Sequence, residues 1–87
     1  MLTHIETASG FAIDIDEKAM DDMEVFELVF AIEDGDMKAY LRLADKIMGA
    51  EGKKRLYEHL RTEGRVPVES FGRELTEILK GLQSAKK

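Results

Sequence analysis

The sequence predicts a single small α+β domain, with an N-terminal β-hairpin followed by about four short α-helices. The chain has 87 residues, a length that suits one domain. Apolar residues alternate near the N-terminus, as they do in strands, and recur at a helical period after Asp16. No internal repeat or low-complexity linker divides the chain. We therefore expect one domain over residues 1–82 and a frayed tail over residues 83–87.

The hairpin is predicted over about residues 2–15. In residues 2–7, Leu2, His4 and Glu6 point to one side and Thr3, Ile5 and Thr7 to the other, and residues 11–15 alternate more strongly. Ser9 and Gly10 form a turn dipeptide between these two runs. Because an isolated two-stranded hairpin is only marginally stable in water, its apolar face is expected to pack on the rest of the domain.

The first helix is predicted over about residues 20–33, since acids stand at its start and Gly35 follows its end. Its apolar residues cover about 220° of a helical wheel, whereas a surface helix needs a stripe of only ~100° or slightly more. These residues are Met23, Val25, Phe26, Leu28, Val29, Phe30 and Ile32. The helix is therefore either central to the core or apolar on two sides, with the second side binding another protein. For that second case, the predicted partner contacts are Met23, Phe26, Val29 and Phe30.

Two further helices are predicted over about residues 36–48 and 51–61. Asp36 is a suitable N-cap for the first of them, and Gly49 is a suitable end. The second is short and has only a thin apolar strip, which indicates a helix at the edge of the core.

The last helix is predicted over residues 67–82. Pro67 is the only proline in the chain, and it marks either the first position of this helix or a functional loop. Proline suits the first helical position, and Glu69 in the first turn suits the positive end of the helix. Gly72 and Gly81 interrupt the pattern, and each costs about 1 kcal/mol relative to alanine in a helix interior. These glycines either permit a neighbouring segment to approach the helix closely or mark a helix that forms fully only when a partner binds.

Several kinds of site are not indicated by the sequence. No run of about 18 apolar residues occurs, so no membrane span is expected. The chain has no cysteine for a disulfide or a thiolate metal site. The acid-rich segment that starts at Asp14 has Lys18 and Ala19 where an EF-hand needs an oxygen ligand and a glycine. No metal or cofactor is therefore predicted.

Catalytic patterns are absent as well. His4 and His59 have no ligand or base partner at motif spacing, so both are predicted to be surface residues. No serine lies in a nucleophile motif. Ser70 stands near a helix start, as the attachment serine of a small acidic carrier domain does, but Glu69 and Phe71 flank it instead of the Asp-Ser-Leu context. The chain is predicted not to be an enzyme.

Charge is distributed unevenly along the chain. Residues 1–37 carry eleven acids and one base, whereas residues 38–87 carry seven acids and twelve bases. Such a chain folds acid onto base or docks head-to-tail with a copy of itself, so a homo-oligomer is one expectation. The densest basic cluster is Lys53, Lys54 and Arg55, which pairs either with acids of the same chain or with an acidic partner. Nucleic acid is not an expected partner, because the chain is acidic overall.

Three segments together resemble a known family. They read SGFAIDID, KAMDDMEV and EGKKRLYEHLRTEGRVPVESFGRELTEIL. The chain resembles the small tail assembly chaperones of long-tailed bacteriophages and prophages over roughly residues 5–82. YEHLR at 57–61 and GRVPVE at 64–69 carry most of the resemblance.

The resemblance implies a non-enzymatic assembly factor that acts in the host bacterial cytoplasm and is absent from the mature virion. Such proteins coat the long helical tape measure protein and help tail tube subunits polymerise around it. The implied partners are therefore the tape measure protein and the tail tube protein. Many family members also have a frameshifted longer form. Two alternatives stay open: a structural virion component such as a head–tail joining subunit, and a small acidic carrier domain modified at Ser70.

Overall fold

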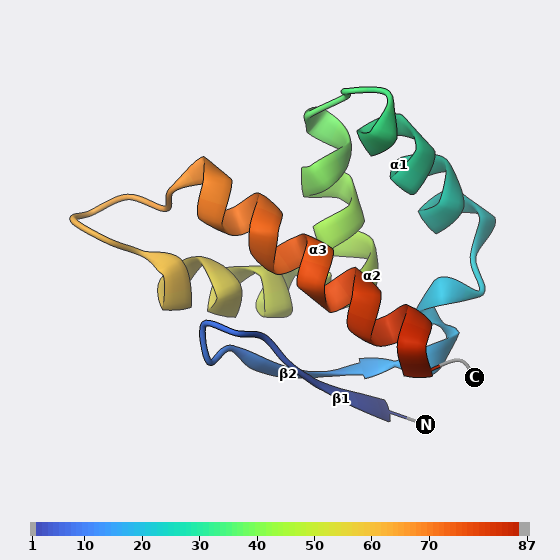
Figure 1. The fold of residues 1–87 in the computed structure, drawn as a ribbon, viewed down its shortest axis with the longest axis horizontal. Coiled ribbons are helices and arrows are strands. Elements are labelled where there is room, and N and C mark those ends of the chain that lie inside the picture. Colours follow the sequence, from blue (N-terminus) through green and yellow to red (C-terminus); the bar gives the residue numbers. More distant parts are fainter. Residues whose placement is uncertain (1, 86–87) are drawn as a thin grey trace.

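The hairpin expected at the N-terminus is present in the computed structural model, which describes residues 2–85 (Figure 1). Strand β1 spans Leu2–Glu6 and strand β2 spans Ala12–Asp16. The two strands pair antiparallel with Ile5 opposite Ile13, and both isoleucines are buried. The alternation in the sequence therefore predicted the buried face of the hairpin correctly.

A short 3-10 helix and α1 follow the hairpin where the sequence predicts one helix. The 3-10 helix η1 spans Glu17–Met20, and α1 spans Met23–Glu33. The carboxylate of Asp22 accepts a hydrogen bond from the Glu24 N–H at 2.9 Å and caps α1. Because an N-cap residue has extended backbone geometry, it separates the two helices, and the helix predicted over 20–33 begins at Met23 instead.

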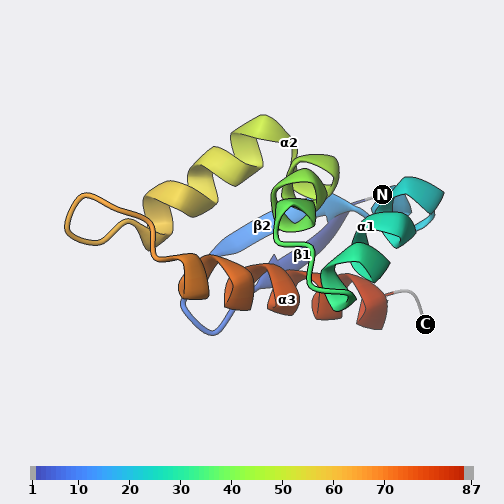
Figure 2. The same cartoon turned by 90° about the horizontal axis from the view of Figure 1, so that it is seen from above.

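Residues 2–85 form three α-helices, and the prediction of about four was wrong. Helix α2 spans Lys38–Leu60 and contains a kink at Gly49, where φ is 74° and ψ is 170°. Its first arm, residues 38–48, and its second arm, residues 50–60, correspond to the two helices predicted in this part of the chain (Figures 1 and 2). Glycine adopts a positive φ without strain because it has no Cβ. One glycine therefore redirects the helix, and helical structure resumes immediately after it.

Helix α3 spans Val68–Ala85. Pro67 directly precedes it, and the Pro67 carbonyl accepts a hydrogen bond from the Phe71 N–H at 3.1 Å. The interpretation of this proline as the start of the last helix is therefore confirmed. Residues 83–85 of the predicted frayed tail belong to α3, and residues 86–87 lie outside the described residues.

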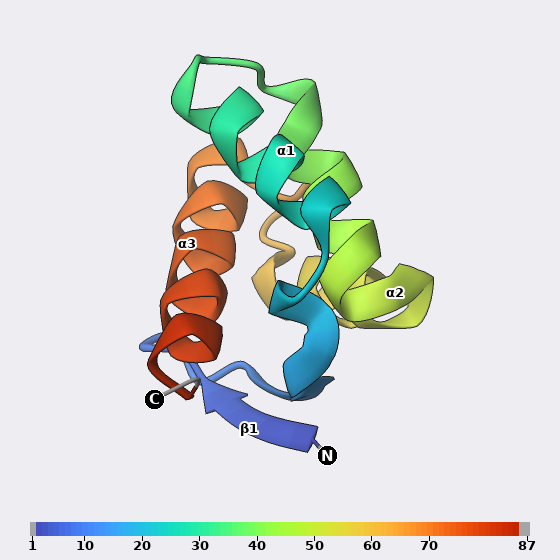
Figure 3. The same cartoon turned by 90° about the vertical axis from the view of Figure 1, so that its right-hand side faces the viewer.

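The core lies between the hairpin and the three helices. Figure 3 shows the hairpin at one edge of the molecule, α3 and α2 above it, and α1 farthest from the strands. The largest fully buried side chains are Val25, Leu43, Leu56, Leu75, Ile78 and Leu82. Two glycines let helices approach the hairpin closely: a Cβ at Gly52 would lie 3.1 Å from Ile13 Cδ1, and one at Gly81 would lie 3.2 Å from Ile5 Cγ2.

Candidate protein-binding surfaces

Three large apolar side chains of α1 face solvent. Met23 is 70% exposed, Phe26 is 39% exposed and Phe30 is 60% exposed. Their spacing of three and four residues places them on one side of the helix, and we call them the α1 stripe. Val25 is only 1% exposed, and the half-buried Val29 packs against the core at the edge of the stripe. Helix α1 is thus apolar on two sides, one packed on the core and one open to solvent.

A second apolar surface is a groove of about 680 Å³ between the first arm of α2 and the start of α3. We call it the α2–α3 groove; the start of α3, which follows the long loop in Figure 1, forms one of its walls. Its apolar lining includes Met37, Leu41, Tyr57, Val68 and Phe71. Met37, Leu41 and Val68 are exposed, so the rim of the groove is apolar as well. All three residues fall on the apolar periodicity of the sequence, a pattern that usually marks a buried face.

Two aromatic rings and a glycine are part of the lining of the α2–α3 groove. The rings of Tyr57 and Phe71 meet edge to face with their centroids 5.5 Å apart. Gly72 lies next to Phe71 in α3, and apart from its chain neighbours and the nearby helix backbone, no atom of the described residues lies within 4 Å of the position that a Cβ would take there. Gly72 therefore widens the groove, and no packing contact within the monomer requires a glycine at this position.

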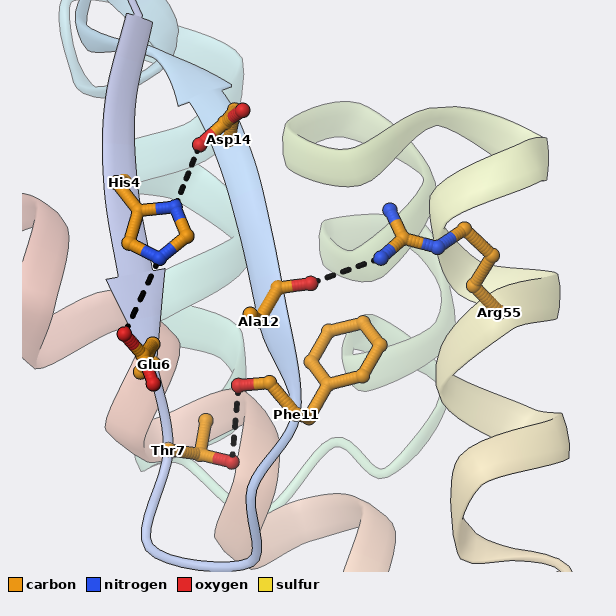
Figure 4. A network of polar contacts seen from close by, with 7 residues as sticks. All are labelled: His4, Glu6, Thr7, Phe11, Ala12, Asp14 and Arg55. Atoms are coloured by element: carbon orange, nitrogen blue, oxygen red, sulfur yellow. Dashed lines mark hydrogen bonds and ion pairs between the residues drawn. The ribbon is translucent and has the colours of Figure 1, made fainter.

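The predicted basic cluster makes contacts within the monomer. Lys53 forms an ion pair with Asp45 at 3.0 Å. Arg55 donates a hydrogen bond to the Ala12 carbonyl at 2.8 Å, and its guanidinium lies 5.5 Å from the centroid of the Phe11 ring (Figure 4). The ion pair of Lys53 joins the second arm of α2 to the first arm, and the contacts of Arg55 join α2 to the hairpin.

Lys54, the third member of the cluster, is exposed. Within residues 2–83, no ion pair or side-chain hydrogen bond involves it. Of the three basic residues predicted as electrostatic partner contacts, Lys54 is therefore the one whose charge is directed to solvent.

Polar contacts hold the tip of the hairpin against α2 and α3. The buried Thr7 hydroxyl donates to the buried Glu74 carboxylate at 2.6 Å, and the Ala8 N–H donates to Glu77 at 2.8 Å. The Ser9 hydroxyl and His59 Nε2 lie 3.1 Å apart. These contacts fix the orientation of the hairpin on the helices.

Both histidines are exposed, as the sequence predicted. His4 Nδ1 lies 2.7 Å from Asp14 and Nε2 lies 3.3 Å from Glu6 (Figure 4). The hydrogen bond to Asp14, and then that to Glu6, raises the pKa of His4 above its ordinary value of 6.5. The contact with Asp14 joins the two strands, whereas Glu6 lies on the same strand as His4, and both contacts become ion pairs when His4 is protonated.

Chemical sites are not apparent in the part of the chain that the structure describes. There, no group of three or more histidine, cysteine, aspartate or glutamate residues is placed to hold a metal ion. No helix within residues 2–85 combines the length and apolarity that a membrane span requires. Ser70 is half-buried in the first turn of α3, next to the exposed Glu69.

Comparison with protein-family models, curated proteins and solved structures finds no match to this chain. The features available for assigning a function are therefore the α1 stripe, the α2–α3 groove and the sequence motifs.

Proposed function

We propose that this protein is a non-enzymatic tail assembly chaperone of a long-tailed bacteriophage or prophage. It acts in the host bacterial cytoplasm, binds the tape measure protein, promotes tail tube assembly and is absent from the mature virion. The observation that carries the proposal is the exposure of the α1 stripe, because Met23, Phe26 and Phe30 face solvent on a domain that has a separate core.

Exposed apolar side chains that gather on one side of a helix are typical of protein-binding surfaces. A stripe at helical spacing suits a long helical client, since two helices pack by interlocking side chains spaced three and four residues apart. Methionine and phenylalanine supply a large contact area, and the flexible thioether of Met23 adapts to different client residues. These properties suit a chaperone that coats one long helical protein at many different positions.

The motifs that carry the resemblance also lie next to an apolar surface. YEHLR at 57–61 covers the end of α2, and GRVPVE at 64–69 covers the loop and the start of α3. Tyr57, Val66 and Val68 from these motifs line the α2–α3 groove. This placement supports a binding role for the motifs.

The direct test is capture of the tape measure protein. The full chain is co-expressed with overlapping segments of the tape measure protein from the same genome, and each pair is co-purified. We expect capture of predominantly helical segments, and at least tenfold weaker capture by the double variant Phe26→Ser/Phe30→Ser. Glu33→Gln, a change at an exposed polar residue of the same helix, serves as the matched control and should retain capture. Failure of the wild-type chain to capture any segment would contradict the proposal.

Two measurements separate this proposal from its alternatives. Mass spectrometry of purified virions should not detect the chain, whereas a head–tail joining subunit would be present in every particle. The intact mass of the protein from its native host should equal the mass of the polypeptide. An added prosthetic group on Ser70 would instead identify a carrier domain.

A further inference from the structure

We propose that the outer edge of strand β1 binds an extended segment of another protein, which adds to the hairpin as a third, antiparallel strand. The described part of the chain forms one sheet of two strands, so β1 pairs with β2 on one side only. In Figures 1 and 3, β1 lies at the margin of the molecule, with the helices above the hairpin. We call the side of β1 that faces away from β2 the β1 edge. Such an edge presents backbone donors and acceptors with which a further strand is able to pair.

The register of the hairpin determines which backbone groups point toward the β1 edge. The Thr7 N–H donates a hydrogen bond to the Phe11 carbonyl at 2.9 Å, so the backbone of Thr7 is directed toward the opposite strand. This direction alternates from one residue to the next along an antiparallel strand. The N–H and C=O groups of Leu2, His4 and Glu6 therefore point outward at the β1 edge.

Other outward backbone groups of the hairpin are already bound by side chains of the helices. The Ala8 N–H continues the outward series beyond β1 and donates to the Glu77 carboxylate at 2.8 Å. The Ala12 carbonyl points outward from β2 and accepts a hydrogen bond from Arg55 at 2.8 Å (Figure 4). Within residues 2–83, no hydrogen bond from a segment outside the hairpin reaches the backbone of β1 itself. The β1 edge is therefore the side of the hairpin that remains for a partner.

Strand β1 lacks three features that commonly prevent the addition of a strand. All five of its residues pair with β2 in one continuous register, so no bulge interrupts the strand. It contains no proline, and the residues that alternate toward the core, Thr3 and Ile5, are uncharged. Its backbone therefore has the regular geometry that pairing with a further strand requires.

The side chains on the outer face of the hairpin indicate which extended segment fits. Residues 2–17 carry four acids and no lysine or arginine. On β1 the Glu6 side chain is 68% exposed and Leu2 is 64% exposed. In an added strand, a basic residue is favoured opposite Glu6 and an apolar residue opposite Leu2, because side chains directly opposite each other are in contact. An antiparallel segment that fits therefore has a lysine or arginine, followed four positions later by an apolar residue.

A second copy of this chain fits the β1 edge poorly. Pairing of two β1 edges would place two acidic hairpin faces side by side, and like charges disfavour that arrangement. The proposed segment also differs from the helical client of the α1 stripe, because it binds in an extended conformation. The inference therefore goes beyond the proposed function and does not rest on it.

The test uses a synthetic peptide with the core Lys-Val-Thr-Val-Leu, in which lysine stands opposite Glu6 and leucine opposite Leu2. The peptide is added to the isotope-labelled full chain and binding is followed by NMR. The outward amides of Leu2, His4 and Glu6 should change their chemical shifts and exchange more slowly with solvent. The amides of Thr3 and Ile5 should change less, since they are directed toward β2 already.

Matched peptides separate the contribution of the backbone from that of charge. N-methylation of the peptide threonine, whose N–H points at β1, should abolish binding, whereas N-methylation of the first valine, whose N–H points away, should not. Glutamate in place of the peptide lysine should weaken binding about three- to tenfold, because it then stands opposite Glu6. The chain variant Glu6→Lys should reverse this preference.

The proposal would be overturned by equal binding of the two N-methylated peptides, by chemical-shift changes centred outside β1, or by no binding at all. Protection of the same amides that rises with protein concentration in the absence of peptide would also overturn it, since the occupant would then be a second copy. Circular dichroism checks that Glu6→Lys is folded, and the peptide comparisons on the wild-type chain decide the question if it is not. Capture of tape measure segments through the α1 stripe is measured separately, so failure of the proposed function is distinguishable from failure of this inference.

Discussion

Thr7 donates a hydrogen bond to Glu74 at 2.6 Å, and this contact joins residues that are 67 positions apart in the chain. Both residues are buried, and Glu74 belongs to α3 while Thr7 directly follows β1. A buried carboxylate requires hydrogen-bond donors because it has lost its hydration. The contact therefore stabilises the position of the hairpin on α3.

Replacing Thr7 with valine should lower the free energy of unfolding by about 1–3 kcal/mol, because the Glu74 carboxylate loses a buried donor while the side-chain volume is kept. Urea denaturation followed by circular dichroism measures the change. Thr7→Ser keeps the hydroxyl and should lie much closer to the wild type. Equal stability of the valine and serine variants would show that the hydrogen bond contributes little.

The hairpin was predictable because its pattern is local. Ile5 lies between His4 and Glu6, and Ile13 and Ile15 flank Asp14; the same alternation decides which side chains are buried. The exposure of part of α1 was also foreseeable, since an apolar arc of about 220° exceeds what one packed face requires. Gly49 marked the kink in α2, but the sequence could not show that helical structure resumes immediately after it.

The α2–α3 groove was not predictable from local patterns. Leu41 and Val68 occupy apolar positions of helices and Met37 directly precedes α2, and the apolar periodicity of the sequence would ordinarily assign all three to the core. They are exposed because the first arm of α2 and the start of α3 do not cover each other's apolar residues at these positions. This arrangement depends on contacts between segments distant in sequence. The wide separation of residues 37–41 from residues 66–76 explains why no spacing rule indicates the groove.

Replacing two helical glycines, Gly52 and Gly72, with alanine should change the stability of the fold in opposite directions. A Cβ at Gly52 would lie 2.7 Å from the Met48 Cβ and 3.1 Å from Ile13 Cδ1, so Gly52→Ala should destabilise the fold by forcing α2 away from β2. Apart from chain neighbours and the nearby helix backbone, no atom of the described residues lies within 4 Å of a Cβ at Gly72, so Gly72→Ala should raise the free energy of unfolding by about 0.5–1 kcal/mol through helix propensity. Thermal unfolding of the two variants side by side measures both effects. A lower melting temperature for Gly72→Ala would show that this glycine has a structural role in the monomer.

Within the basic cluster, Arg55 should contribute to the stability of the fold and Lys54 should not. Arg55→Ala removes the contacts to Ala12 and Phe11, so it should destabilise the docking of the hairpin. Lys54→Ala should leave the unfolding midpoint in urea within error of the wild type, because the exposed Lys54 makes no described side-chain contact. In client capture, charge reversal at Lys54 is the appropriate test of an electrostatic role, since the fold stays intact. A strong loss of stability in Lys54→Ala would contradict this division.

His4 should titrate at a higher pH than an ordinary histidine. The hydrogen bonds to Asp14, and then to Glu6, favour the protonated ring and raise the pKa of His4 above 6.5. Because the folded-state pKa exceeds the unfolded value, this contribution to stability is complete below pH 6.5 and is lost as the pH rises through the folded-state pKa. An NMR titration of the imidazole signals measures the midpoint. Asp14→Asn should move the midpoint back toward 6.5, and an unchanged midpoint would contradict the assignment.

Asp22 should make the attachment of α1 sensitive to acid. Its carboxylate forms an ion pair with Lys46 at 3.1 Å and caps α1 through the Glu24 N–H, and these contacts lower the pKa of Asp22 below its ordinary value of 3.8. Because the folded-state pKa is the lower one, this contribution to stability is complete above pH 3.8 and is lost as the pH falls through the folded-state pKa. Asp22→Asn keeps an N-cap acceptor but removes the charge, whereas Asp22→Ala removes both. In acid titrations followed by circular dichroism, the asparagine variant should lose part of the acid-dependent step and the alanine variant should be less stable at neutral pH as well. If both variants had the same stability as the wild type at every pH, Asp22 would not stabilise the start of α1. Other contacts would then have to hold α1, and with it the α1 stripe, on the core.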